Sequence, residues 1–120
     1  MNKRVLIVED SFDNMIIATA ILQSMGYTVL QAEDGVEGFN LANSEKPDVV
    51  IMDYHLPGMN GLEATRRMKE SDTLRDIPVI VLTADIYAKQ AFVEAGCDAY
   101  LNKPIRKGSL LRTVNQVLSA

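Results

Sequence analysis

The chain has 120 residues, of which 48% are hydrophobic and 23% are charged, a composition that fits one domain with one core and argues against disorder. Its net charge of −4 and its lack of a basic run argue against binding to nucleic acid or to an anionic membrane. The chain has one cysteine, Cys97, which excludes an internal disulfide and a Cys-based metal site. It has no apolar run of membrane-spanning length and no recognisable targeting signal. We therefore expect a cytoplasmic protein.

Predicted strands and helices alternate along the chain. In order they are expected at residues 5–8, 13–25, 27–31, 35–45, 49–52, 61–70, 79–82, 86–95, 99–101 and 107–118. The runs 5–8, 49–52 and 79–82 are apolar at every position, which is typical of central strands in a parallel sheet covered by helices on both faces. The more mixed runs 27–31 and 99–101 suit sheet edges. Five βα units in succession predict an α/β fold with a doubly wound parallel sheet.

The first predicted helix has apolar residues on more than one side. A stripe of Met15, Ala18, Leu22 and Met25 is expected to face the core, and Gly26 is expected to end the helix. A second apolar group lies on the side away from that stripe and consists of Phe12, Ile16, Ile17 and Ala20. Because one side of a helix in such a domain faces solvent, this second group predicts a docking face.

Polar residues gather where the predicted strands end. They are Glu9 and Asp10 after the first strand, Asp53 after the third, Thr83 after the fourth, where the small Ala84 follows it, and Lys103 after the fifth. Ligands of doubly wound sheets bind beyond these carboxyl ends, so we expect the side chains to converge. Helix capping could explain any one of the acids, but it does not explain their convergence.

The convergence predicts phosphoryl chemistry. Three carboxylates held close together repel one another, and a divalent cation relieves that repulsion. Oxygen ligands suit Mg²⁺ in particular. The Lys103 ammonium and the Thr83 hydroxyl could then contact a phosphoryl group. Such a site acts mainly by positioning and by neutralising charge.

Four motifs, in this order and spacing, identify a family: LIVED (6–10), IMDYHLPGMNG (51–61), VLTA (81–84) and YLNKP (100–104). Through them essentially the whole chain resembles the receiver (response-regulator, CheY-like) domain of two-component signalling. The resemblance implies a flavodoxin-like (βα)5 sandwich whose five-stranded parallel sheet has the order 2-1-3-4-5. It also implies one phosphoacceptor domain over residues 1–120, which is not an enzyme but assists its own Mg²⁺-dependent phosphorylation and dephosphorylation.

The resemblance assigns a role to each residue of the site. Asp53 would accept a phosphoryl group from the phosphohistidine of a sensor histidine kinase or histidine phosphotransferase. Mg²⁺ would be held by Asp10, by Glu9 through water, by Asp53 and by the backbone carbonyl of His55. Lys103 would pair with the phosphoryl oxygens.

Further residues would form the switch. Thr83 would move toward the phosphoryl group, with Ala84 leaving room beside it, and Tyr100 would move inward with Thr83. A cis peptide bond is expected before Pro104. In the family, the position of His55 and that of Asp85 influence how fast the acyl phosphate hydrolyses, so we expect these two residues to set the lifetime of the signal.

The resemblance also implies two partner surfaces. The kinase or phosphotransferase would dock on the first helix, at Phe12, Ile16, Ile17 and Ala20. An output protein that the sequence does not identify would bind the face formed by residues 86–95, 99–101 and 107–118. The span from Thr83 to Lys103 is shorter than is typical of the family, which places the choice of output partner in question. The chain ends after the fifth helix, so it is either a single-domain regulator or a piece of a larger protein.

Three other functions compete with this interpretation. An aspartyl phosphatase of similar architecture would need a second Asp two residues after Asp53, where this chain has His55. A flavin-binding domain would need a Ser/Thr/Gly-rich phosphate loop after the first strand, where this chain has the acidic run that begins at Glu9. A receiver that has lost phosphorylation and works only as a scaffold is disfavoured by the presence of Asp10, Asp53, Thr83 and Lys103.

Overall fold

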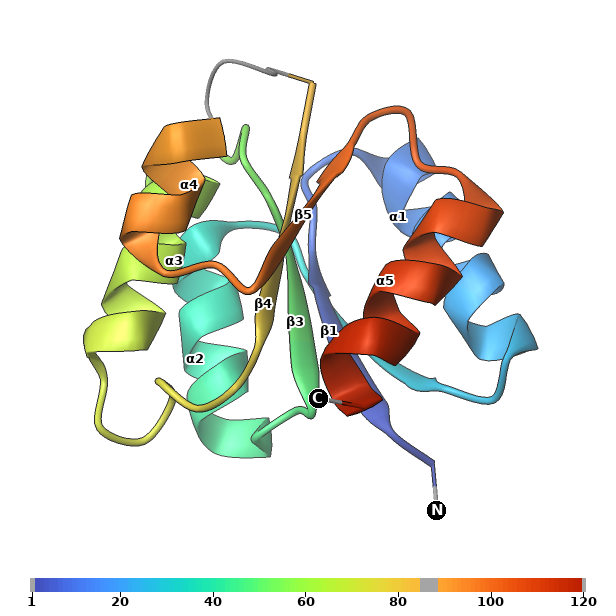
Figure 1. The fold of residues 1–120 in the computed structure, drawn as a ribbon, viewed down its shortest axis with the longest axis horizontal. Coiled ribbons are helices and arrows are strands. Elements are labelled where there is room, and N and C mark those ends of the chain that lie inside the picture. Colours follow the sequence, from blue (N-terminus) through green and yellow to red (C-terminus); the bar gives the residue numbers. More distant parts are fainter. Residues whose placement is uncertain (1, 85–88, 120) are drawn as a thin grey trace.

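The computed structural model describes residues 2–84 and 89–119 (Figure 1). Strands and helices alternate throughout: β1 (Arg4–Val8), α1 (Phe12–Ser24), β2 (Thr28–Ala32), α2 (Gly35–Glu45), β3 (Val49–Asp53), α3 (Gly61–Glu70), β4 (Val79–Thr83), α4 (Lys89–Ala95), β5 (Ala99–Asn102) and α5 (Lys107–Ser119). The five strands are parallel and lie in the order β2-β1-β3-β4-β5. The doubly wound fold and its strand order are confirmed.

The position of each strand follows from its sequence. Every residue of β3 and of β4 is buried, as their uninterrupted apolar runs predict for strands covered on both faces. The mixed sequences of β2 and β5 occupy the two edges of the sheet, where one side of the strand has no neighbour. The predicted central and edge strands are therefore confirmed.

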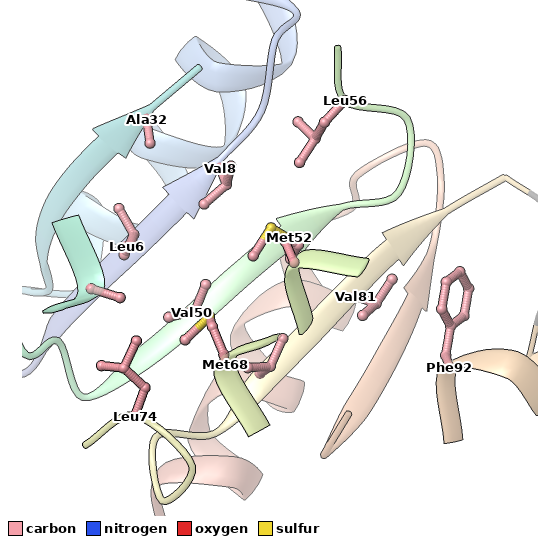
Figure 2. Close-up of a cluster of buried hydrophobic side chains, with 13 residues drawn as sticks. Leu6, Val8, Ala32, Val50, Met52, Leu56, Met68, Leu74, Val81 and Phe92 are labelled. Carbon is pink, nitrogen blue, oxygen red and sulfur yellow. The ribbon is translucent and has the colours of Figure 1, made fainter. Parts of the chain in front are cut away.

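Helices cover both faces of the sheet, with α1 and α5 on one face and α2, α3 and α4 on the other (Figure 1). Successive residues of a strand point to opposite faces, so Val5 and Ile7 pack against α1 and α5. Leu6 and Val8 point the other way, into the core beneath α2, α3 and α4 (Figure 2). Each fully buried aliphatic side chain contributes roughly 1.5–3 kcal/mol, so the two clusters fix the sheet that carries the strand ends.

Three helices begin with a side-chain cap directly after a loop at the carboxyl edge of the sheet. Ser11 Oγ accepts from Asn14 N at 3.3 Å, and Asp34 Oδ1 accepts from Glu37 N at 2.8 Å. In the same way Asn60 caps α3. Each cap satisfies a donor that the first helical turn leaves free, and it fixes where the chain leaves the site and enters the helix.

The end of α1 differs from expectation. Met25 is not part of the core stripe: it lies beyond the end of α1 and is 56% exposed. The backbone N–H of Met25 donates to the carbonyl oxygens of Leu22 and Gln23, as at a helix end, and Gly26 follows at φ 88°. The helical periodicity therefore does not extend to the Met25 side chain. The described part of α4 is Lys89–Ala95, and predicted positions 86–88 lie outside the described residues.

None of the helices described is both long enough and apolar enough to cross a membrane.

Candidate functional site

The candidate site lies at the carboxyl edge of the sheet, where the predicted residues do come together. Asp53 ends β3 and Thr83 ends β4. Glu9 and Asp10 follow β1, and each of the carboxylates of Glu9, Asp10 and Asp53 offers one oxygen within 4.8 Å of the others. Glu9, Asp53 and Thr83 are almost fully buried, whereas Asp10 is exposed. One wall of the cluster is therefore open to solvent.

Lys103, just after β5, reaches across this cluster. Its Nζ lies 2.8 Å from Asp53 Oδ1 and 3.6 Å from Glu9 Oε1. Its backbone N–H donates to Thr83 O at 2.8 Å, and the peptide bond to Pro104 is cis, as expected. Although the ion-pair distance to Asp53 is short, neither Asp53 Oδ1 nor Glu9 Oε1 accepts a directed hydrogen bond within the described residues. Two buried carboxylate oxygens are thus left with coordination capacity.

The pKa of Glu9 reflects this crowding. Burial, and then the neighbouring Asp53 carboxylate, raise the pKa of Glu9 from 4.5 to about 7. Burial disfavours the charged form of Lys103, but the contacts with Asp53 and then with Glu9 outweigh burial and raise its pKa. With a pKa of about 7, the Glu9 carboxyl is therefore only partly ionised near neutral pH.

A divalent cation fits this arrangement. The three convergent carboxylates, the two buried oxygens without a directed hydrogen bond and the open side at Asp10 match an oxygen-ligated ion that keeps some of its waters. The acidic cluster could bind a metal, and Mg²⁺ is the ion that its ligand chemistry favours.

A close backbone contact holds the loop after Asp53. Gly61 N donates to Tyr54 O at 2.9 Å, and a Cβ added at Gly61 would lie 2.1 Å from the carbonyl oxygen of Asp53. Only glycine allows α3 to start this close to the strand end. The same loop also turns at Gly58, which has φ 72°. Sequence reasoning missed the contact at Gly61, whose signal was a glycine at the first helical position, directly after the cap Asn60.

The remaining predicted residues surround the cluster. His55 is exposed, with its ring 4.8 Å from that of Tyr54. Ala84 is exposed, and Tyr100 is half-buried in β5 with Lys89 Nζ 5.2 Å from its ring centroid. Asp85 lies outside the described residues.

The apolar outer side of α1 borders the site and faces solvent. Phe12 is 77% exposed, Ile16 50% and Ile17 45%, and Ala20 is also exposed. The expected placement of these four residues away from the core is confirmed.

Comparison with known proteins identifies the family. Residues 5–115 match the family model of the response regulator receiver domain. Protein PilH of Pseudomonas aeruginosa is 42% identical over 122 residues, which cover 97% of this chain and 98% of PilH. The polar-differentiation response regulator DivK of Brucella anthropi is 37% identical over 120 residues, which cover 98% of each chain.

Solved structures agree with the family match. A putative response regulator from Chloroflexus aurantiacus superposes with a TM-score of 0.96 at 31% identity, over 100% of both chains. The receiver domain of sensor histidine kinase PA1611 from P. aeruginosa superposes with a TM-score of 0.93 at 30% identity, again over 100% of both chains, and holds a magnesium ion in its active-site cleft. This chain belongs to the response regulator receiver family, and it is a CheY-like receiver domain of two-component signalling.

Proposed function

We propose that Asp53 accepts a phosphoryl group from the phosphohistidine of a sensor histidine kinase or histidine phosphotransferase, and that the resulting acyl phosphate changes which partner this domain binds. The observation that carries the proposal is the buried Asp53 carboxylate, held 2.8 Å from Lys103 within a cluster of three carboxylates. We take residues 1–120 as one receiver domain, which works in the cytoplasm, where its one free thiol stays reduced.

The residues would act by positioning and by charge. A carboxylate oxygen of Asp53 attacks phosphorus, the phosphorus–nitrogen bond of phosphohistidine breaks, and the electron pair leaves with the imidazole. Lys103, whose pKa is raised, stays protonated and pairs with the phosphoryl oxygens. Glu9, Asp10, Asp53 and the His55 carbonyl would hold Mg²⁺, which supplies further positive charge to the phosphoryl oxygens when bound.

Phosphorylation would be read out along β4 and β5. The Thr83 hydroxyl would donate to a phosphoryl oxygen, and the small Ala84 leaves space beside it. Tyr100 would then move inward, changing the surface formed by α4, β5 and α5, where an output partner binds. Water would later release phosphate from Asp53 at this same site, so the domain assists its own phosphorylation and dephosphorylation without turning over any other substrate.

The donor protein would dock on α1. Phe12, Ile16, Ile17 and Ala20 form an exposed apolar face beside the acidic cluster, and an apolar helix face of this kind suits the histidine-bearing helices of a kinase or phosphotransferase.

Intact-protein mass tests the acceptor directly. The chain is incubated with acetyl phosphate, with and without Mg²⁺, in the wild type and in Asp53→Asn. A gain of one phosphoryl group that needs Mg²⁺ and is lost in Asp53→Asn is the expected result. No gain in a folded wild-type protein would instead favour a scaffold that binds partners without being phosphorylated.

A further inference from the structure

Acidic residues are concentrated in the first part of the chain. Residues 5–45 contain seven Asp and Glu residues and no Lys, Arg or His, although the whole chain has 12 Lys and Arg residues. This segment forms β1, α1, β2 and α2. The flank of the domain that includes the apolar face of α1 is therefore rich in acidic residues. Arg4, the first residue of β1, pairs with Glu45 at the far end of α2.

A hollow of about 250 Å³ joins this acidic flank to the apolar residues of α1. On the α1 side it is lined by Phe12, Met15 and Ile16, and on the α2 side by Glu33 and Glu37. We call this feature the acidic hollow. Its two sides differ in chemistry: one offers apolar surface, and the other offers carboxylates.

The two carboxylates on the α2 side of the acidic hollow lack cationic partners among the described residues, whereas Glu9 at its inner end lies 3.6 Å from Lys103 Nζ. Within the described part of the chain, neither Glu33 nor Glu37 forms an ion pair. Glu9 and Asp10 also line the hollow, and Glu9 is 2% exposed with an Oε1 that accepts no directed hydrogen bond from the described residues. The hollow therefore shares two carboxylates, those of Glu9 and Asp10, with the phosphoacceptor site.

A long cationic side chain satisfies both sides of the acidic hollow. The methylene groups of Lys or Arg can pack against Phe12 and Ile16 while the charged end reaches the carboxylates of Glu33 and Glu37. A guanidinium can in addition stack on the exposed ring of Phe12. A neutral apolar side chain would leave the carboxylates without a partner, and a small metal ion would leave the apolar side bare.

We infer that the acidic hollow receives a Lys or Arg side chain of the histidine-bearing protein that docks on α1. The identity of that protein rests on the proposed function, whereas the recognition of the cationic side chain belongs to the unphosphorylated domain and can be measured without any phosphoryl transfer. The contact would orient the donor protein, because it lies beside Glu9 and Asp10 rather than at a remote part of the surface.

The test uses N-acetyl-arginine methylamide as the probe and its citrulline counterpart as the neutral control of matched shape. Both are titrated into ¹⁵N-labelled protein at low ionic strength, with Mg²⁺ present so that the Glu9–Asp10 end of the hollow is not the cation's main target. We expect saturable shifts in the amides of residues 12–16 and 31–37 with the arginine probe only. Binding should be weak, since the probe lacks the rest of the partner.

Two charge-matched variants separate specific recognition from overall charge. Glu33→Gln with Glu37→Gln should weaken arginine binding at least about threefold, as expected from the loss of two exposed charge contacts. Asp72→Asn with Glu94→Gln changes the net charge equally at exposed positions elsewhere and should leave binding unchanged. Circular dichroism checks that both variants are folded.

Three results would overturn the inference: equal shifts with the citrulline probe, arginine shifts that map elsewhere, or equal weakening in the two variants. Absence of any saturable shift would also overturn it. None of these results depends on Asp53, and the mass experiment on Asp53 does not depend on Glu33 or Glu37, so failure of one proposal is distinguishable from failure of the other.

Discussion

At the scale of single residues, Gly61 packs directly against the backbone of Asp53, the proposed phosphoacceptor. Gly61→Ala would place a Cβ 2.1 Å from Asp53 O and 2.9 Å from Tyr54 Cα, so the strand end or the start of α3 must shift. Overpacking of this kind costs roughly 1–3 kcal/mol. We expect a lower free energy of unfolding in urea, together with slower labelling of Asp53 by acetyl phosphate.

Gly108→Ala is the matched control for that substitution. A Cβ at Gly108 meets only the end of the Arg112 side chain, at 4.0 Å, and alanine favours a helix over glycine by up to about 1 kcal/mol. This variant should be at least as stable as the wild type and should label at the same rate. Equal behaviour of the two variants would show that the contact between Gly61 and Asp53 does not constrain the site.

The sequence predicted which residues of the site converge but not how tightly they are held. Asp53 and Lys103 could be placed because parallel strands put their carboxyl ends on one edge of the sheet. The contact of Gly61 with Asp53, and the pKa of Glu9 near 7, depend on distances of a few ångströms between separate elements. Periodicity and motif spacing carry no such distances, so these features emerged only from the packed structure.

At the scale of elements, α1 has one face in the core and an exposed apolar face that we propose as the docking surface. Replacing Ile16 and Ile17 by Gln keeps good helix formers in α1 but removes apolar surface that is half exposed in the free domain. Labelling by acetyl phosphate should be unchanged. Transfer from a kinase or phosphotransferase that phosphorylates the wild type should fall about tenfold or more, as for the loss of an apolar anchor at an interface.

Met25→Gln is the control for the α1 variant, because Met25 is 56% exposed and lies beyond the other end of the helix. It should retain the wild-type rate with both donors. Parallel loss of both reactions in Ile16→Gln with Ile17→Gln would indicate a damaged fold, and retention of both would place the docking surface elsewhere.

Elements themselves were predicted well, because each has a distinct pattern. The β3 and β4 runs are apolar at every position and bounded by loops, and both are central strands. The assignment of Met25 to the core face is wrong: its spacing from Leu22 continues the stripe, but the last residue of α1 is Ser24, one position earlier. Helix ends are decided by local backbone hydrogen bonds, which periodicity does not report.

At the scale of the whole molecule, we expect the metal-free domain to lose stability as pH rises, because of the buried Glu9 carboxyl. The pKa of Glu9 is about 7 in the folded protein and 4.5 ordinarily. Between these values the folded state keeps a proton that the unfolded chain releases, so folding stability falls as pH increases from about 4.5 to 7. Lys103 has a raised pKa and remains charged throughout this range.

Mg²⁺ should reverse that trend, because it binds the ionised carboxylates and competes with the Glu9 proton. A ligand that binds only the folded state, at a free concentration about a hundred times its dissociation constant, stabilises the folded state by about 2.7 kcal/mol. This raises the melting temperature of a domain of this size by several degrees. We therefore expect Mg²⁺ to raise the melting temperature more at pH 8 than at pH 5.5, as measured by differential scanning calorimetry. In Glu9→Gln the gain from Mg²⁺ should no longer depend on pH.

The substitution Asp10→Asn tests whether Asp10 binds the metal ion or only contributes to the folded structure. Asp10 is exposed, and one of its carboxylate oxygens lies within 4.8 Å of those of Glu9 and Asp53, so neutralising it removes repulsion. Without Mg²⁺ the variant should melt at or above the temperature of the wild type, and it should gain little when Mg²⁺ is added. Asp72→Asn, at a highly exposed position, should gain as much as the wild type. If Mg²⁺ raised the melting temperature of Asp10→Asn as much as that of the wild type, the ion would bind outside the cluster, because the exposed carboxylate of Asp10 would then not be needed to hold it.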